Sequence, residues 1–145
     1  MPNITKTEAD AIIAEPKIIS ANLRWQPWHR GFRLNGLTGA AVVASNSQQI
    51  LKLTGYIGRK NRSLTLLFKN QRIRGYCVKE RHRNPDGQII NGPHKHSWED
   101  VDEDNWTYVP TDVRSGDVNV ELLDFLTECN VHLTSSYQPL LIPIV

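Results

Sequence analysis

Three of the five histidines fall within residues 82–96: His82, His94 and His96. The pKa of an imidazole lies close to neutrality, so two histidines can remove one proton and donate another at physiological pH. Metal-free cleavage of RNA needs both steps, because the 2′-hydroxyl loses a proton and the leaving oxygen gains one. It also needs nearby cations, and this stretch supplies Arg81, Arg83 and Lys95. The first interpretation is an acid–base site formed by the three histidines and Lys95.

A metal site is the second interpretation. His94 and His96 are two residues apart, so on a strand both side chains lie on one face, with Cα atoms about 6–7 Å apart. Such a pair can supply two ligands to a divalent metal ion. No acid stands at a spacing that fixes the remaining ligands. The candidates for completing the shell are Asp86, Glu99, Asp100 and His82.

In the third interpretation the histidines catalyse nothing. The turn sequences at residues 84–87 and 91–93 then brace a binding loop or stabilise the fold, with the histidines as structural residues. The sequence contains no Ser/His/Asp order, glycine-rich phosphate loop or Cys-x-x-Cys motif that points to another chemistry. The residues alone leave all three interpretations open.

A predicted β-hairpin leads into the histidines. Residues 63–68 alternate apolar and polar side chains, and residues 72–82 form the second strand after a short connection. A period of two places Arg72 and Arg74 on one face of that strand and Cys77 on the other. Asn-Pro-Asp-Gly then closes a tight turn, and Asn-Gly-Pro makes a second turn before a strand that begins at His94.

Two helices frame this β-rich region. Thr5 and Glu8 form a capping box for a short helix over residues 6–14, which ends before Pro16. A second helix begins at Asp117 or Asn119 and carries an apolar stripe. The sequence therefore predicts a single α+β domain over residues 1–145. Its expected form is a curved, partly barrel-like antiparallel sheet with an N-terminal and a C-terminal helix.

Charge is segregated along the chain although the formal net charge is only +2. Residues 59–83 hold nine Lys and Arg against one acid, whereas residues 97–128 hold ten acids against one Arg. A basic surface favours RNA or another nucleic acid; the alternative is that the two regions face each other within the fold or across a homodimer. The predicted nucleic-acid-binding residues are Arg59, Lys60, Arg62, Arg72, Arg74, Arg81 and Arg83. The predicted protein-binding acids are Glu99, Asp100, Asp102, Glu103 and Asp104.

Composition indicates an ordinary globular chain with a mean hydropathy of −0.42. No apolar run approaches the roughly 20 residues of a membrane-spanning helix, and the N-terminus lacks a secretory signal pattern. Cys77 and Cys129 are interpreted as buried thiols in a reducing compartment, which predicts a cytoplasmic protein. No cofactor is expected under the first interpretation, and a divalent metal is expected under the second.

The run from His82 to His96 resembles a family of small uncharacterised bacterial and phage proteins with an H-x-N-P-D-G…P-H-x-H core. The resemblance extends to the acidic stretch 99–104, to Trp106–Pro110 and to the helix ending near Cys129. It implies a prokaryotic or phage setting connected with defence, counter-defence or toxins. The leading hypothesis is an RNA-directed protein of a phage–host conflict system, acting as a metal-independent endoribonuclease. The alternative is a non-catalytic inhibitor or adaptor that binds a nucleoprotein or protein partner.

Overall fold

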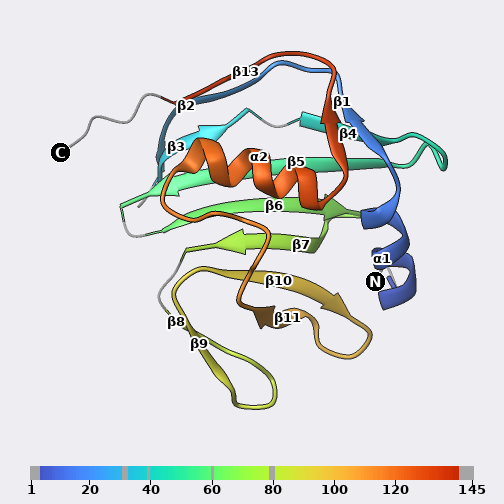
Figure 1. The fold of residues 1–145 in the computed structure, drawn as a ribbon, viewed down its shortest axis with the longest axis vertical. Helices are drawn as coiled ribbons and strands as arrows, with labels where there is room; N and C mark the ends of the chain where they lie inside the picture. Colours follow the sequence, from blue (N-terminus) through green and yellow to red (C-terminus); the bar gives the residue numbers. More distant parts are fainter. Residues whose placement is uncertain (1–3, 31–32, 39, 60, 79–80, 141–145) are drawn as a thin grey trace.

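The computed structural model describes residues 4–30, 33–38, 40–59, 61–78 and 81–140. In these residues the chain is mostly sheet with two helices, which confirms the α+β class (Figure 1). The predicted helix over residues 6–14 is confirmed, and Thr5 caps it by accepting a hydrogen bond from the Glu8 N–H at 3.0 Å. The helices are α1 (Lys6–Ala14) and α2 (Val118–Glu128). The strands are β1 (Lys17–Ile19), β2 (Leu23–Arg30), β3 (Arg33–Leu37), β4 (Ala40–Ala44), β5 (Ile50–Gly58), β6 (Arg62–Phe68), β7 (Gln71–Cys77), β8 (Arg81–Arg83), β9 (Ile89–Asn91), β10 (His94–Glu99), β11 (Glu103–Tyr108), β12 (Val131–Leu133) and β13 (Tyr137–Gln138).

One large sheet organises the molecule. Its order is β11-β10-β7-β6-β5-β3-β2-β13, with β4, β1 and β12 branching from β5. Most pairings are antiparallel, but β1 with β12 and β13 with β2 are parallel. Within the described residues the path ends at β11 and β13 without these strands pairing, so the sheet does not close. The expectation of a partly barrel-like sheet is therefore not supported.

The sheet has two unlike faces. Helix α2 lies across one of them, over β5 and β6 (Figure 1), and buries Leu122, Phe125 and Leu126 there. Asp117 caps α2 by accepting hydrogen bonds from the N–H groups of Asn119 and Val120. Because strand side chains alternate, Leu51 and Leu53 of β5, Leu64 and Leu66 of β6 and Tyr76 of β7 contribute to this apolar core. The residues between them form the opposite face, which α2 does not cover.

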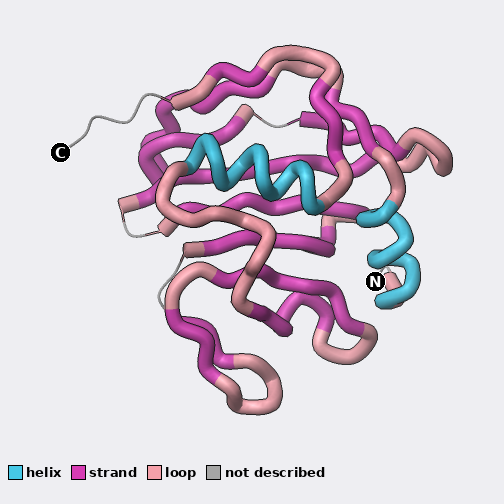
Figure 2. The backbone as a smooth tube through the Cα atoms, viewed as in Figure 1, coloured by secondary structure: helices cyan, strands magenta, loops and turns pink. Residues whose placement is uncertain are grey.

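Strands β8 and β9 form a separate two-stranded hairpin, which extends beyond β10 at one end of the molecule (Figure 2). The predicted turn closes it, since Gly87 donates its N–H to the Asn84 carbonyl at 2.8 Å and has a φ of +90°. Gly92 has a φ of +82° at the second predicted turn. No helix among the described residues is long and apolar enough to cross a membrane.

Candidate metal and acid–base site

Two rows of side chains cross four adjacent strands on the sheet face away from α2. Strand register sets one row as Thr54, Thr65, Gly75 and His96, and the other as Tyr56, Ser63, Cys77 and His94. Residues from both rows line a cavity of about 630 Å³. The histidines on β10 thus lie at one end of a polar hollow whose floor continues over β7 and β6 to β5.

The three histidines of the central stretch converge at this cavity. The His94 and His96 ring centroids are 5.2 Å apart, and the His82 centroid lies 5.4 Å from that of His94 and 5.2 Å from that of His96. His82 comes from β8 of the separate hairpin, and its ring nevertheless lies beside the two histidines of β10. This convergence is the condition on which both the acid–base and the metal interpretations depend.

Asn84 holds the hairpin in that position. Its amide donates to the Thr107 carbonyl at 3.0 Å, and its Oδ1 accepts from the Thr107 N–H at 2.9 Å and hydroxyl at 2.7 Å. Asn84 is only 4% exposed, so losing these bonds would leave buried polar groups unpaired. The asparagine therefore ties β8 to β11 and fixes the approach of His82.

Each of the three rings is oriented by a backbone carbonyl. Nδ1 of His94 lies 3.0 Å from the Gly92 oxygen, Nδ1 of His96 lies 2.7 Å from the Asp104 oxygen, and Nε2 of His82 lies 3.0 Å from the Asn105 oxygen. A carbonyl only accepts, so each of these nitrogens carries the proton. In the neutral ring the lone pair then belongs to Nε2 of His94 and His96 and to Nδ1 of His82. A carbonyl that fixes the tautomer in this way is typical of metal-binding histidines.

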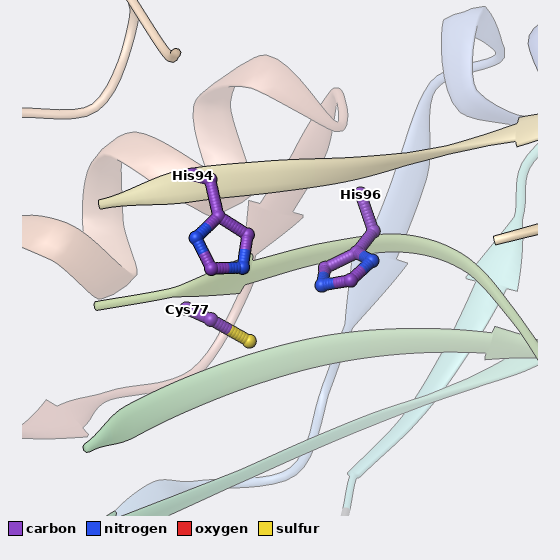
Figure 3. A group of neighbouring side chains, drawn as sticks. All are labelled: Cys77, His94 and His96. Carbon is purple, nitrogen blue, oxygen red and sulfur yellow. The ribbon is translucent and has the colours of Figure 1, made fainter. Parts of the chain in front are cut away.

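Cys77 joins two of these histidines. Its Sγ and one ring nitrogen each from His94 and His96 all lie within 4.8 Å of one another, and Figure 3 shows the three side chains pointing toward a common space. All three are buried, at 8%, 2% and 5% exposure. Cys77 faces His94 directly across the β7–β10 pair. The sequence interpretation treated Cys77 as an inert thiol and missed it.

Burial keeps the His96 ring neutral. It lowers the pKa of His96 to about 4, and the positive charge of Arg72 lowers it further, against the hydrogen bond to the Asp104 carbonyl, which raises it. A neutral imidazole is a metal ligand or a proton acceptor at pH 7, whereas a general acid must already carry its proton. The environment of His96 therefore suits the first two roles.

A β-bulge brings Arg72 to the same cavity. The register between β6 and β7 shifts between Leu66 and Leu67, so that Ile73 is an extra residue between Arg72 and Arg74. The two arginines consequently leave the strand on opposite faces: Arg72 lines the cavity, and Arg74 forms an ion pair with Glu128 of α2 at 3.4 Å. The prediction that they share a face is wrong, because a bulge reverses the alternation of side chains.

Lys95 is not part of the cluster. It lies between His94 and His96 and so points to the opposite face of β10, where it is fully buried. There its ammonium group is paired with Glu128 of α2 and lies 3.2 Å from Asp112. The sequence grouped Lys95 with the catalytic histidines, and strand alternation separates them.

The other predicted nucleic-acid-binding residues have several different environments. Arg62 is bound by Glu121 of α2 at 2.8 Å and Arg72 by Asp104 at 2.9 Å, so part of the basic region faces the acidic region within the fold. Arg59, Arg81 and Arg83 are exposed, and Lys60 lies outside the described residues. Because Arg81 and Arg83 flank His82 on a strand, they leave β8 on the face turned away from the cavity.

The predicted acidic surface is also partly used within the chain. Asp100 accepts a hydrogen bond from the Lys6 N–H at 2.6 Å, and Glu99 pairs with the Lys6 side chain at 3.3 Å. Asp102 accepts from the Trp106 indole at 2.8 Å. Glu103 remains exposed, at the β10–β11 connection. Asp86, Glu99 and Asp100, which the sequence offered as further metal ligands, are not in the Cys77 cluster.

No curated protein and no solved structure matches the chain. A family model does match, over residues 4–131, which includes both helices, the histidine cluster and Cys77. The match covers most of the chain and carries no assigned activity, so any statement about function depends on the site itself. The chain belongs to this family, which is described as a family of unknown function (DUF6978).

Proposed function

We propose that Cys77, His94 and His96 bind a zinc ion and that the protein is a metal-dependent hydrolase, with His82 handling the proton. One observation carries the proposal: a buried thiol and two buried imidazoles meet at the end of a 630 Å³ cavity, beside a third imidazole. A thiolate with two neutral imidazoles is a donor set that suits Zn²⁺.

The spacing of the rings supports a tetrahedral ion. A Zn–N distance of about 2.1 Å, with roughly 1.1 Å from nitrogen to ring centre, separates imidazole centroids by about 5.2 Å in tetrahedral geometry. The separation between the two proposed imidazole ligands, His94 and His96, is 5.2 Å. Nitrogen and sulfur atoms bound to one zinc ion lie about 3.4–3.6 Å apart. The three ligand atoms lie within 4.8 Å of one another, so binding an ion would need them to approach by no more than roughly 1.4 Å.

The arrangement supports a catalytic rather than a closed structural ion. Structural zinc has four protein ligands, whereas catalytic zinc has three and one open position. His82 lies outside the group of three mutually close ligand atoms, although its ring is next to both histidines. A zinc ion held by Cys77, His94 and His96 would lower the pKa of a bound water and polarise the substrate. His82, whose ring lies next to those of His94 and His96, would accept a proton from the attacking water.

Metal binding can be tested with cobalt, because a Co²⁺–thiolate bond gives an intense charge-transfer absorption. We expect one ion per chain, with this absorption lost in Cys77→Ser and weakened in His94→Asn and His96→Asn. Cys129→Ala is the matched control, since it removes the second buried thiol, which lies in the apolar core. Folded wild-type protein that binds neither Co²⁺ nor Zn²⁺ would refute the metal centre.

The metal-independent endoribonuclease is the second candidate, and the convergence of three imidazoles with Arg72 favours it. It predicts that labelled RNA is cut in EDTA and that His82→Ala and His96→Ala abolish the cut. Cleavage that disappears in EDTA and returns with Zn²⁺ supports the hydrolase. RNA that is bound but not cut under either condition favours the non-catalytic binding protein.

A further inference from the structure

We infer that the substrate of this site is a phosphodiester, whose non-bridging oxygens bind the guanidinium group of Arg72. The inference rests on the proposed function and names its substrate class. It follows from three features: how the fold places Arg72, which polar groups line the cavity, and where His82 lies.

The fold places Arg72 at the histidines by specific means. The bulge at Ile73 turns the Arg72 side chain toward the cavity. The aliphatic part of Arg72 then lies over Gly75, and Gly75 faces His96 across the β7–β10 pair. A Cβ on Gly75 would lie 2.8 Å from the Arg72 Cδ, so a larger residue would displace the arginine. Asp104 holds Nε at 2.9 Å. The terminal Nη groups of the planar fork remain as donors, and a phosphate accepts such a pair.

The cavity wall favours an anion with polar substituents. Its described lining includes Arg72 and no carboxylate, and the Asp104 carboxylate that pairs with Arg72 offsets part of the arginine's charge. A zinc ion with one thiolate adds a further net positive charge, so the bound site attracts a negatively charged substrate. Hydroxyls of Thr54, Ser63 and Thr65 line the floor, and Oδ1 of Asn61 is a buried acceptor without a hydrogen-bond partner in the described structure. These groups can form hydrogen bonds with the hydroxyl and N–H donors of a nucleoside, whereas an apolar substituent on the substrate would leave them unpaired.

His82 lies beside both proposed metal-binding histidines, where it can take a proton from an attacking water. Water would lose a proton to Nδ1 of His82 as its oxygen forms a bond to phosphorus. The bond from phosphorus to the ester oxygen opposite the water would break, that oxygen would take a proton from solvent, and the His82 imidazolium would return its proton to solvent. One water is consumed, and a phosphomonoester and an alcohol are formed. Arg72 stabilises the charge on the non-bridging oxygens during this step.

Two small probes separate the substrate class from the metal centre. We expect zinc-loaded protein to hydrolyse bis(p-nitrophenyl) phosphate well above the rate of free zinc and to leave p-nitrophenyl acetate near its zinc-only rate. Arg72→Met should lower kcat/KM for the diester by roughly 10²- to 10³-fold with zinc content unchanged, as for loss of one transition-state donor. Arg114→Met removes an exposed arginine outside the cavity lining and should retain full activity.

Gly75→Ala gives an independent test, since it changes no charge. It should displace Arg72 and reduce diester hydrolysis while cobalt still binds to Cys77. Protein that binds zinc but leaves the diester intact, or an Arg72→Met variant as active as wild type, overturns the phosphodiester inference and leaves the metal centre standing. Absence of zinc binding refutes the proposed function itself, and the two failures are therefore distinguishable.

Discussion

Glu121 offers a direct test of how the two oppositely charged regions are joined. Its carboxylate is 1% exposed and accepts two hydrogen bonds from Arg62, at 2.8 and 2.9 Å. It also accepts from the Tyr76 hydroxyl at 2.8 Å and the Gly116 N–H at 3.2 Å. Glu121→Gln keeps the volume of the side chain and removes its charge. The variant thus leaves Arg62 without a charged partner at the junction of β6 and α2, and it replaces one accepting oxygen by an NH2 group that faces other donors.

The expected cost follows from this burial. Breaking a buried ion pair costs about 3–5 kcal/mol, and the Arg62 side chain is 30% exposed and can reach water, so we expect about 3 kcal/mol. For a chain of this size that corresponds to a fall in Tm of roughly 6–12 °C. Asp124→Asn is the control on the same helix, because its partner Arg114 is 78% exposed, and it should cost less than about 1 kcal/mol. Equal losses in urea unfolding for the two variants would refute the assignment.

Three further predictions concern the site. In chelator-treated protein the folded pKa of His96, about 4, lies below its unfolded value of 6.5, so the unfolded state binds more protons between these values. The free energy of unfolding should therefore fall by about 3 kcal/mol from pH 7 to pH 4, and urea titrations should show this component missing in His96→Gln. Asn84→Ala should reduce turnover by misplacing His82 yet leave zinc stoichiometry unchanged, as measured by metal analysis. Zinc at about 100 times its Kd should raise the unfolding free energy by about 2.7 kcal/mol in calorimetry, and no change in Tm would contradict a bound ion.

Local signals in the sequence predicted the elements that depend on near neighbours. Thr5 and Glu8 identify the start of α1, and Asn130 takes a positive φ of 56° at the end of α2, as its sequence context indicates. The turn at Gly87 and the alternation of β6 were equally readable. Such features follow from backbone geometry within a few residues and do not require knowledge of strand order.

Strand order and register decided what the sequence could not predict. Nothing in the local pattern shows that β7 lies between β6 and β10, so nothing showed that Cys77 would face His94. The bulge that turns Arg72 toward the cavity also depends on pairing with β6, and a simple period of two gives the wrong face. The exclusion of Lys95 was predictable by the same period, since it alternates with two histidines that share a face.

Ion pairs within the fold reduce the number of cations in residues 59–83 that can bind a substrate. The sequence concentrates nine cations in residues 59–83, but Arg62 and Arg74 are paired with acids of α2, and Arg72 is held by Asp104. A broad basic surface binds nucleic acid with a steep dependence on salt, because each phosphate contact releases counterions. A site built on one held arginine and a metal centre makes few such contacts. Binding of a single-stranded RNA oligonucleotide should therefore weaken only slightly between 50 and 200 mM salt, with the slope expected for roughly one phosphate contact. A steep dependence would instead show that the exposed arginines outside the cavity supply most of the affinity.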